Sequence, residues 1–141
     1  MAIDTASIES LLVSLYVYGD RLSPEIISSH LGVAPTRSHQ KGDVKESKGG
    51  KLVSVKTGIW ELQSQRKSLI ISEHIADIFS GLNKEGIYLP SLDGVDEVHL
   101  DVYASGMLSG DGYKHLDFEL ALEDMLLLSS IGASVRFSVA D

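Results

Sequence analysis

The chain has 141 residues, 43% of them hydrophobic, and it contains no cysteine. This size suits one domain, residues 1–141, whose core needs neither disulfides nor cysteine-bound metal, and it favours a reducing, cytoplasmic compartment. The net charge of −8 argues against nucleic acid and anionic membrane as partners, and no apolar run approaches the roughly 18 residues of a membrane helix.

The first expected element is a strand, because Leu11, Val13, Leu15 and Val17 occupy every second position. A short helix should follow from Pro24 to Leu31. Ser23 precedes it as a capping residue, proline is favoured at the first helical position, and Gly32 is a typical stop.

Residues 34–51 show no sustained periodicity, and their glycines and polar side chains predict a long loop. Val53 and Val55 indicate a possible strand start, and Gly58 to Leu62 predicts a further strand. Trp60, the only tryptophan, is interpreted as a core residue of that strand, although it could also stack on a ligand.

The second half begins with a helix whose apolar residues run from Ile71 to Leu82 and which should stop at Gly86. Glu73, His74 and Asp77 are interpreted as its solvated face. The pattern then predicts a hairpin of strands 98–103 and 116–120, a helix from Leu122 to Ile131 and a closing strand over 135–139.

The expected order is therefore β-α-β-α-β-β-α-β. If the first helix, the loop and the tryptophan strand are an excursion, the remainder has the ferredoxin-like order β-α-β-β-α-β. We expect a two-layer α+β domain with its helices on one face of a mostly antiparallel sheet.

Five short segments follow one another in the first sixty residues: Tyr18-Gly19-Asp20, Leu22-Ser23-Pro24-Glu25-Ile26, Pro35-Thr36-Arg37-Ser38, Lys41-Gly42-Asp43 and Thr57-Gly58-Ile59-Trp60. In this order and spacing the chain resembles the bacterial family catalogued as domain of unknown function 4279. The second half resembles that family in its rhythm of helices and strands. The resemblance implies a small, mostly single-domain bacterial protein with no established activity to carry over.

Charge is divided unevenly along the chain. Residues 1–70 hold nine Lys and Arg against seven Asp and Glu, whereas residues 71–141 hold three against thirteen. Segment 37–67 carries eight basic residues and three acidic ones, and segment 93–124 carries nine acidic residues and one lysine. An acidic surface of this kind repels nucleic acid and steers a basic partner, although it also serves plain solubility.

The basic loop offers one candidate ligand site. Arg37, His39 and Lys41, with Asp20 and Trp60 nearby, are residue types that bind a phosphate or carboxylate. The alternative is structural, with Arg37 paired to Asp20 or Asp43 so that it holds the loop on the first strand. No glycine-rich phosphate loop supports a nucleotide.

Motifs of catalysis and metal binding are missing from the sequence. The five histidines form no His-x-x-x-His or His-x-His pair, and no Gly-x-Ser-x-Gly elbow occurs. We therefore assign no catalytic residue, metal or cofactor, and we favour a protein that is not an enzyme.

The leading functional hypothesis is a non-catalytic, cytoplasmic protein-binding module, similar in role to an immunity protein against a basic toxin domain. Its acidic surface would include Asp101, Asp117 and Glu119 on the polar side of the expected hairpin. The alternative is a protein or enzyme that binds a small anion or phosphate ligand through loop 36–43. A third hypothesis is a homodimer in which the basic loop of one copy binds the acidic half of another.

Overall fold

The computed structural model describes residues 10–83, 85–105 and 118–140. Along the chain the elements are β1 Ser10–Gly19, α1 Pro24–Leu31, β2 Arg37–His39, β3 Val44–Glu46, β4 Leu52–Ser54, β5 Gly58–Gln63, α2 Ile71–Ser80, the 3-10 helix η1 Leu89–Ser91, β6 Glu97–Ser105, α3 Leu122–Ile131 and β7 Ser134–Ala140. Five strands form one sheet in the order β2-β5-β1-β6-β7, and β3 and β4 pair separately.

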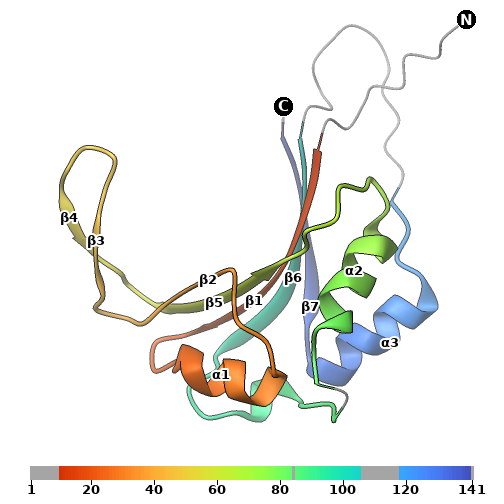
Figure 1. Ribbon diagram of the computed structural model, residues 1–141, viewed down its shortest axis with the longest axis horizontal. Coiled ribbons are helices and arrows are strands. Elements are labelled where there is room, and N and C mark those ends of the chain that lie inside the picture. Colours follow the sequence, from red (N-terminus) through yellow and green to blue (C-terminus); the bar gives the residue numbers. More distant parts are fainter. Residues whose placement is uncertain (1–9, 84, 106–117, 141) are drawn as a thin grey trace, which may run out of the picture.

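The helices lie on one side of the five-stranded sheet and leave its other side bare (Figure 1). The sheet bends away from the helices, so the bare side, which we call the open face, is concave. All neighbouring strands are antiparallel except β6 and β7. The expected α+β class, with helices on one face of a mostly antiparallel sheet, is confirmed.

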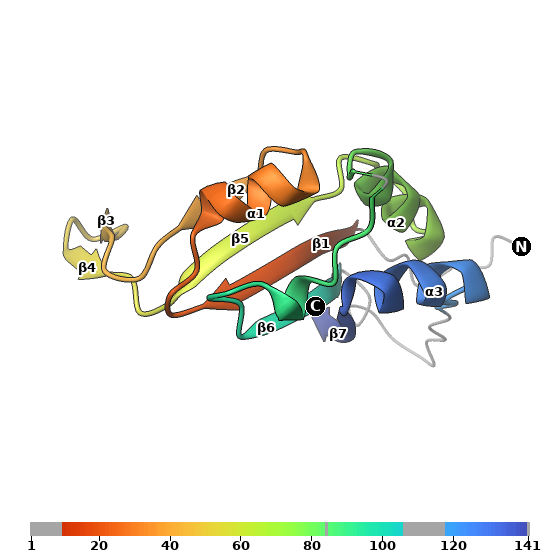
Figure 2. The same ribbon diagram turned by 90° about the horizontal axis from the view of Figure 1, so that it is seen from below.

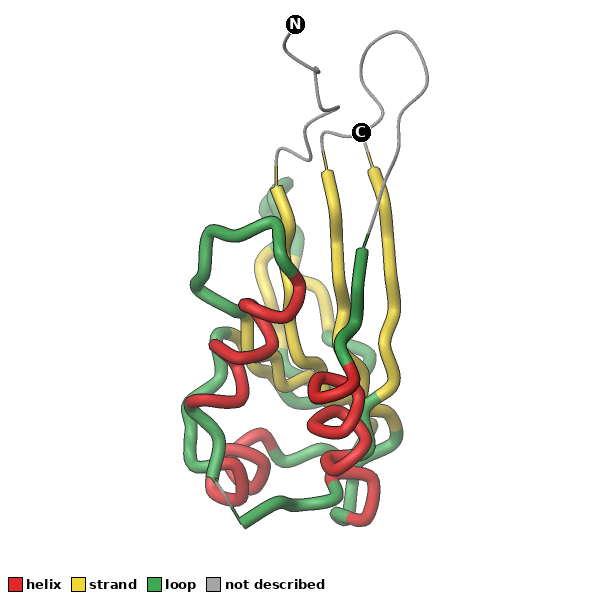
Figure 3. Tube along the Cα trace, turned by 90° about the vertical axis from the view of Figure 1, so that its right-hand side faces the viewer, coloured by secondary structure: helices red, strands yellow, loops and turns green. Residues whose placement is uncertain are grey.

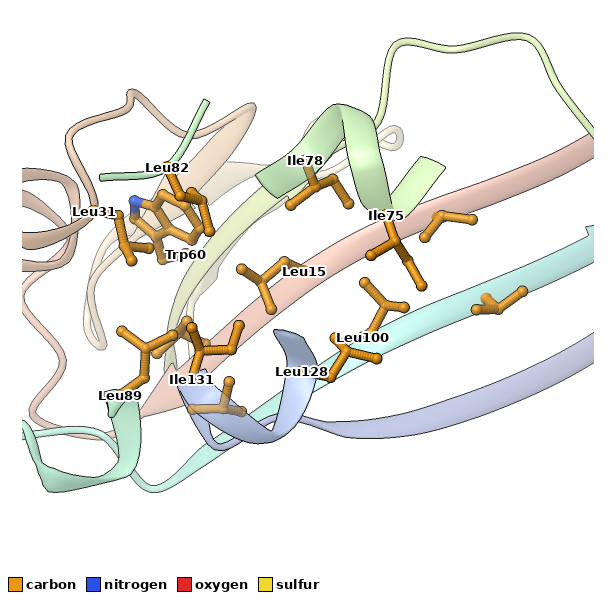
Figure 4. Packing of buried hydrophobic residues seen from close by; sticks show 14 of the residues in the cluster. Leu15, Leu31, Trp60, Ile75, Ile78, Leu82, Leu89, Leu100, Leu128 and Ile131 are labelled. Atoms are coloured by element: carbon orange, nitrogen blue, oxygen red, sulfur yellow. The ribbon is translucent and has the colours of Figure 1, made fainter. Parts of the chain in front are cut away.

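The core lies between the sheet and the helices (Figure 4). β1 contributes Val13, Leu15 and Val17, which are fully buried, and β5 contributes Trp60, which is also fully buried. The Trp60 ring nitrogen donates a hydrogen bond to Ser28 Oγ of α1 at 3.0 Å. Each such apolar side chain contributes about 1.5–3 kcal/mol on burial.

The predicted bounds of α1 are confirmed. Pro24 occupies the first helical position, and Gly32 ends the helix in the left-handed conformation, with φ of 73° and its N–H bonded to the Ser28 carbonyl. Ser23 is extended as a capping residue should be, but its side chain makes no capping hydrogen bond. The end predicted for the next helix is wrong, because α2 stops at Ser80 and not at Gly86.

The segment predicted as one long loop is more ordered than its composition indicates. β2 forms within it and pairs with β5, and β3 pairs with β4 in a separate two-stranded hairpin. The side chains of β3 are all exposed, so apolar periodicity could not reveal this strand, whereas Val53 had indicated the strand that the structure shows as β4. Figure 1 shows this hairpin beyond the α1 end of the sheet, on the side of the open face.

The strand predicted over residues 116–120 as the partner of β6 can be compared with the structure only from residue 118 on. Residues 118–121 have no regular structure, and residues 106–117 lie outside the described part of the chain. The chain continues into α3 and then β7, which returns parallel to β6. The described residues 118–120 therefore do not form the predicted strand, while the exact order and the ferredoxin-like relationship stay expectations.

His74 was expected on a solvated helix face, but it is buried. Its Nε2 lies 2.7 Å from the Ser68 carbonyl oxygen and its Nδ1 lies 2.8 Å from Ser64 Oγ. Asp77 accepts hydrogen bonds from the same segment, including one of 2.8 Å from the Gln65 N–H. These polar residues hold the connection between β5 and α2 against the helix, which a helical period alone cannot predict.

Two glycines of the segments that carry the family resemblance, Gly19 and Gly58, are required by close backbone contacts. A Cβ on Gly19 would lie 1.8 Å from the Gly94 carbonyl oxygen, and one on Gly58 would lie 2.6 Å from that of Gly19. Any side chain at these positions would displace backbone atoms. The glycines therefore allow β5, β1 and the loop before β6 to meet closely.

Candidate functional site

The open face carries polar and aromatic residues at the positions that alternate with the core. One row crosses the whole sheet, because Arg37 pairs with Glu61, Glu61 with Tyr16, Tyr16 with His99 and His99 with Ser134. Residues in the adjoining rows share this face. We define the open-face cluster as Arg37, Glu61, Tyr16, Tyr18, Glu97, His99, Asp101 and Arg136.

Arg37 and Glu61 form the β2 end of the open-face cluster. Arg37 Nε donates to Glu61 Oε1 at 3.0 Å. Glu61 is only 8% exposed, whereas about half of the Arg37 side chain is accessible. The buried carboxylate therefore holds a guanidinium group that still presents hydrogen-bond donors to solvent.

Two tyrosines and a histidine stack at the centre of the open-face cluster. The Tyr16 and Tyr18 rings are 5.4 Å apart and nearly parallel, at an angle of 4°. The His99 ring lies 5.5 Å from Tyr16 and 5.3 Å from Tyr18. Each contact restricts the neighbouring rings, so the three form a pre-organised aromatic platform.

Tyr16 also interacts with the ion pair beside it. Burial raises the pKa of Tyr16 to about 12, and a hydrogen bond to Glu61 and the charge of that carboxylate add to the effect. Burial likewise raises the pKa of Tyr18. Both phenols therefore stay neutral at physiological pH and keep a hydroxyl group that can donate and accept hydrogen bonds.

His99 is the most buried member of the open-face cluster, at 3% exposure. Its Nδ1 lies 3.4 Å from Glu97 Oε1 but makes no hydrogen bond among the described residues. Burial lowers the pKa of His99, while the charge of Asp101 acts in the opposite direction. The imidazole is therefore neutral at pH 7, and Glu97 interacts instead with Arg136 of β7.

The candidate ligand residues of the basic loop are not gathered into one site. Asp20 forms an ion pair with Lys41 at 3.6 Å, and Arg37 pairs with Glu61. Trp60 is buried on the helix side of the sheet, while Arg37 lies on the open face. His39 is nearly buried, and its pKa is lowered by burial and then by Lys45 and Arg37.

The structural alternative for Arg37 named the wrong partners. Arg37 pairs with Glu61, and with neither Asp20 nor Asp43. Asp20 pairs with Lys41, and Asp43 accepts a hydrogen bond of 2.8 Å from the Gln40 N–H within its own loop. Arg37 joins β2 to β5, and not the loop to the first strand, β1, as the alternative required. The cross-strand register with Glu61 explains the choice, since the two residues face each other on neighbouring strands.

The three proposed partner-binding acids have different locations. Asp101 lies on the open face, and Glu119 is exposed in the irregular segment before α3. Asp117 lies outside the described residues. Among the residues that the structure describes, no group of three His, Asp or Glu side chains could hold a metal ion.

The sequence interpretation missed Tyr16, Tyr18, Glu61 and Arg136 as candidate site residues. Their signal was the alternation of the strands, since Tyr16 and Tyr18 occupy the positions between the core residues of β1. His99 alternates in the same way with the core residues of β6. What the sequence could not show was that β1, β5 and β6 are neighbours, which brings these side chains together.

The fold and the open face define a small α+β domain with one helix-covered and one bare, polar-aromatic sheet surface. The chain belongs to the family described as domain of unknown function (DUF4279), whose profile matches residues 8–141. No curated protein and no solved structure matches it. In the described residues, no helix has the length and apolar character needed to cross a membrane.

Proposed function

We propose that this protein is a non-catalytic binding module of the bacterial cytoplasm that recognises a partner protein through the open face of its sheet. The observation that carries the proposal is the open-face cluster, in which polar and aromatic side chains from all five strands interact. In Figure 3, which is seen from the helix side, the helices lie in front of the strands, and no helix of the described residues lies over the open face behind them. A sheet surface built for solubility alone would not need stacked rings and a buried carboxylate.

The dimensions of the open-face cluster favour a macromolecular partner. Arg37 and Arg136 lie on the two edge strands, which are separated by four strand spacings, or roughly 19 Å. A small metabolite would span only part of this width. A protein surface could contact both arginines and the aromatic platform between them.

The residue types also suit protein recognition. Tyrosine and arginine are enriched among the residues that dominate binding energy in protein interfaces. Here the tyrosines are fixed by stacking and Arg37 by Glu61, so little side-chain freedom would be lost on binding.

Charge indicates the chemistry of the partner. The open-face cluster holds three carboxylates, Glu61, Glu97 and Asp101, against two guanidinium groups, and the whole chain has a net charge of −8. Basic side chains on the partner would meet Asp101 and Glu97, and the overall field would accelerate their approach. Of the acids in the sequence-based hypothesis, this surface includes Asp101, so the proposed recognition surface is moved from the expected hairpin to the open face.

Affinity capture tests the proposal. The immobilised full chain is exposed to a bacterial lysate, captured proteins are identified by mass spectrometry, and each is then titrated in purified form. Tyr18→Ala should weaken binding at least tenfold, because one of the three rings of the platform is lost. Tyr88→Ala is the matched control, since Tyr88 is an exposed tyrosine outside the open face, next to η1.

Charge reversal provides a second arm of the same experiment. Asp101→Lys should slow association and flatten its dependence on salt, whereas Glu25→Lys, on exposed α1 surface, should not. Equal effects of Tyr18→Ala and Tyr88→Ala would contradict recognition through the open face.

The anion-binding alternative has no comparable support from the geometry. Arg37 and Lys41 each have a carboxylate partner. The hollow of about 420 Å³ beside β2 is lined by Glu25 and Asp43 as well as by His39. Two carboxylates at this hollow oppose a phosphate.

A further inference from the structure

Helix α3 presents apolar side chains to solvent. Asp124, Leu128 and Ile131 form its buried side. Leu122 and Leu126 are nevertheless 64% and 62% exposed, and Met125 is also exposed. Exposed apolar side chains grouped on one side of a helix are typical of a surface that packs against another element, so this outer surface of α3 is suited to a further contact.

β7 adds to this apolar surface at the edge of the sheet. Among the described residues it pairs on one side only, with β6. Phe137 and Val139 lie on its helix side but remain 52% and 41% exposed. Figure 2 shows α3 beside β7, and a hollow lined by Met125, Leu128 and Val135 joins the two elements.

The two edges of the sheet differ in their protection against pairing with another strand. β2 has only three residues and follows Pro35 closely. β7 has seven residues, contains neither proline nor glycine, and carries one charge, Arg136, which is paired with Glu97. Proteins usually shorten, charge or interrupt an exposed edge strand, and β7 has little of this protection.

β7 is complementary to itself in an antiparallel arrangement. A twofold axis at Phe137 places Val135 opposite Val139 of the second copy and Arg136 opposite Ser138 of the second copy. The residues on the helix side, Val135, Phe137 and Val139, then form one continuous apolar row. The charged residue never faces its own copy, so this register contains no like-charge pair.

We propose that the occupant of this surface is a second copy of the chain, with β7 pairing antiparallel to β7 about Phe137 and the outer sides of α3 packing together. An exposed strand edge is a template for pairing with another strand, and the self-complementary register favours β7 of the second copy as that strand. In the dimer, the five-stranded sheets of the two copies join at β7 into one continuous sheet of ten strands. Its two open faces lie on the same side.

Cross-linking tests the register directly, because the chain has no cysteine of its own. Residue 137 lies on the proposed axis, where facing Cα atoms are about 4.5–5.5 Å apart, within the range of a disulfide. Phe137→Cys should therefore form a covalent dimer under mild oxidation. Ser134→Cys is the matched control, since its two copies would be roughly 20 Å apart along the strands.

Sedimentation velocity of the full chain tests the association itself. The unmodified protein should have the mass of a dimer from about 10 to 100 µM, and it should keep that mass in 1 M salt, which screens surface charge pairs. A dimer that persists at high salt is held by apolar contacts, whereas a dimer between the basic loop of one copy and the acidic half of another would dissociate. Phe137→Glu and Leu126→Glu should each weaken association at least tenfold.

Leu52→Glu and Ile26→Glu are matched controls at exposed apolar positions on β4 and α1, and both should remain dimeric. Circular dichroism checks that each variant is folded. If Phe137→Glu does not fold, Leu126→Glu, whose side chain is exposed on α3, still tests the association. A monomer at 100 µM, equal cross-linking through residues 134 and 137, or dimers that survive both α3 and β7 variants would overturn the proposal.

Discussion

The two faces of the five-stranded sheet are formed by the same strands but stabilised differently. The helix side is apolar and is fully buried at its centre, where Leu15 and Trp60 lie. The open side also contains buried residues, but these are polar, and each depends on a specific neighbour, as Glu61 depends on Arg37. Stability is therefore concentrated on one face, whereas the other face holds side chains in defined positions for contact.

Removing the central aromatic residue of the covered face should have the largest effect. Trp60→Ala deletes a fully buried ring and leaves a cavity beneath α1, at a cost of about 3–5 kcal/mol in the free energy of unfolding. Tyr18→Ala on the open face should cost about 1 kcal/mol. Chemical denaturation measures both, and similar losses would contradict this division of the sheet.

Breaking the ion pair of the open face should have an intermediate effect. Arg37→Ala leaves the Glu61 carboxylate buried without its guanidinium partner, which should reduce the free energy of unfolding by about 1–3 kcal/mol. Adding Glu61→Gln to Arg37→Ala removes the isolated charge and should restore part of the loss. Strictly additive effects in this double-mutant cycle would show that the two residues are not coupled.

The smallest expected effect concerns pH. The folded-state pKa of His99 is lowered from 6.5, so the unfolded chain binds a proton more readily at this residue. The resulting loss of stability begins as pH falls through about 6.5 and continues toward the folded-state pKa. His39 has a pKa shifted in the same direction, so it contributes similarly.

Urea unfolding at several pH values between about 7.5 and 5.5 measures this loss. His99→Gln should reduce the dependence on pH without abolishing it, because His39 remains. Protonation would place a cation beside Arg136 and beside the carboxylates of Glu97 and Asp101, which partly compensate it. An unchanged profile in His99→Gln would rule out His99 as a source of the dependence.

Much of the fold was predictable because its core strands and helices have strong periods. β1, α1, β5, α3 and β7 were found with nearly correct bounds, and Trp60 was correctly interpreted as core. β2 and β3 were missed because three residues with mostly exposed side chains have no detectable period. These strands depend on pairing with residues far along the chain.

The candidate site was less predictable, because it is a product of strand order. Arg37 was identified as important from its sequence neighbours, but its partner Glu61 is 24 residues away and becomes adjacent only in the sheet. Gly19 and Gly58, which belong to the segments that carry the family resemblance, have a packing explanation in their backbone contacts. These two residues therefore serve the close approach of strands and not a ligand.

The β3–β4 hairpin offers a practical route to observing the open face. Its strands form their own small sheet, and the turn between them includes Ser47 and Gly50, joined by a backbone hydrogen bond of 2.9 Å. Exposed turns of this kind tolerate insertions well. A fluorophore attached through a cysteine at Lys48 would be the only thiol-linked label on the molecule. It would report the arrival of a partner by its change in emission, while leaving the core and the sheet unlabelled.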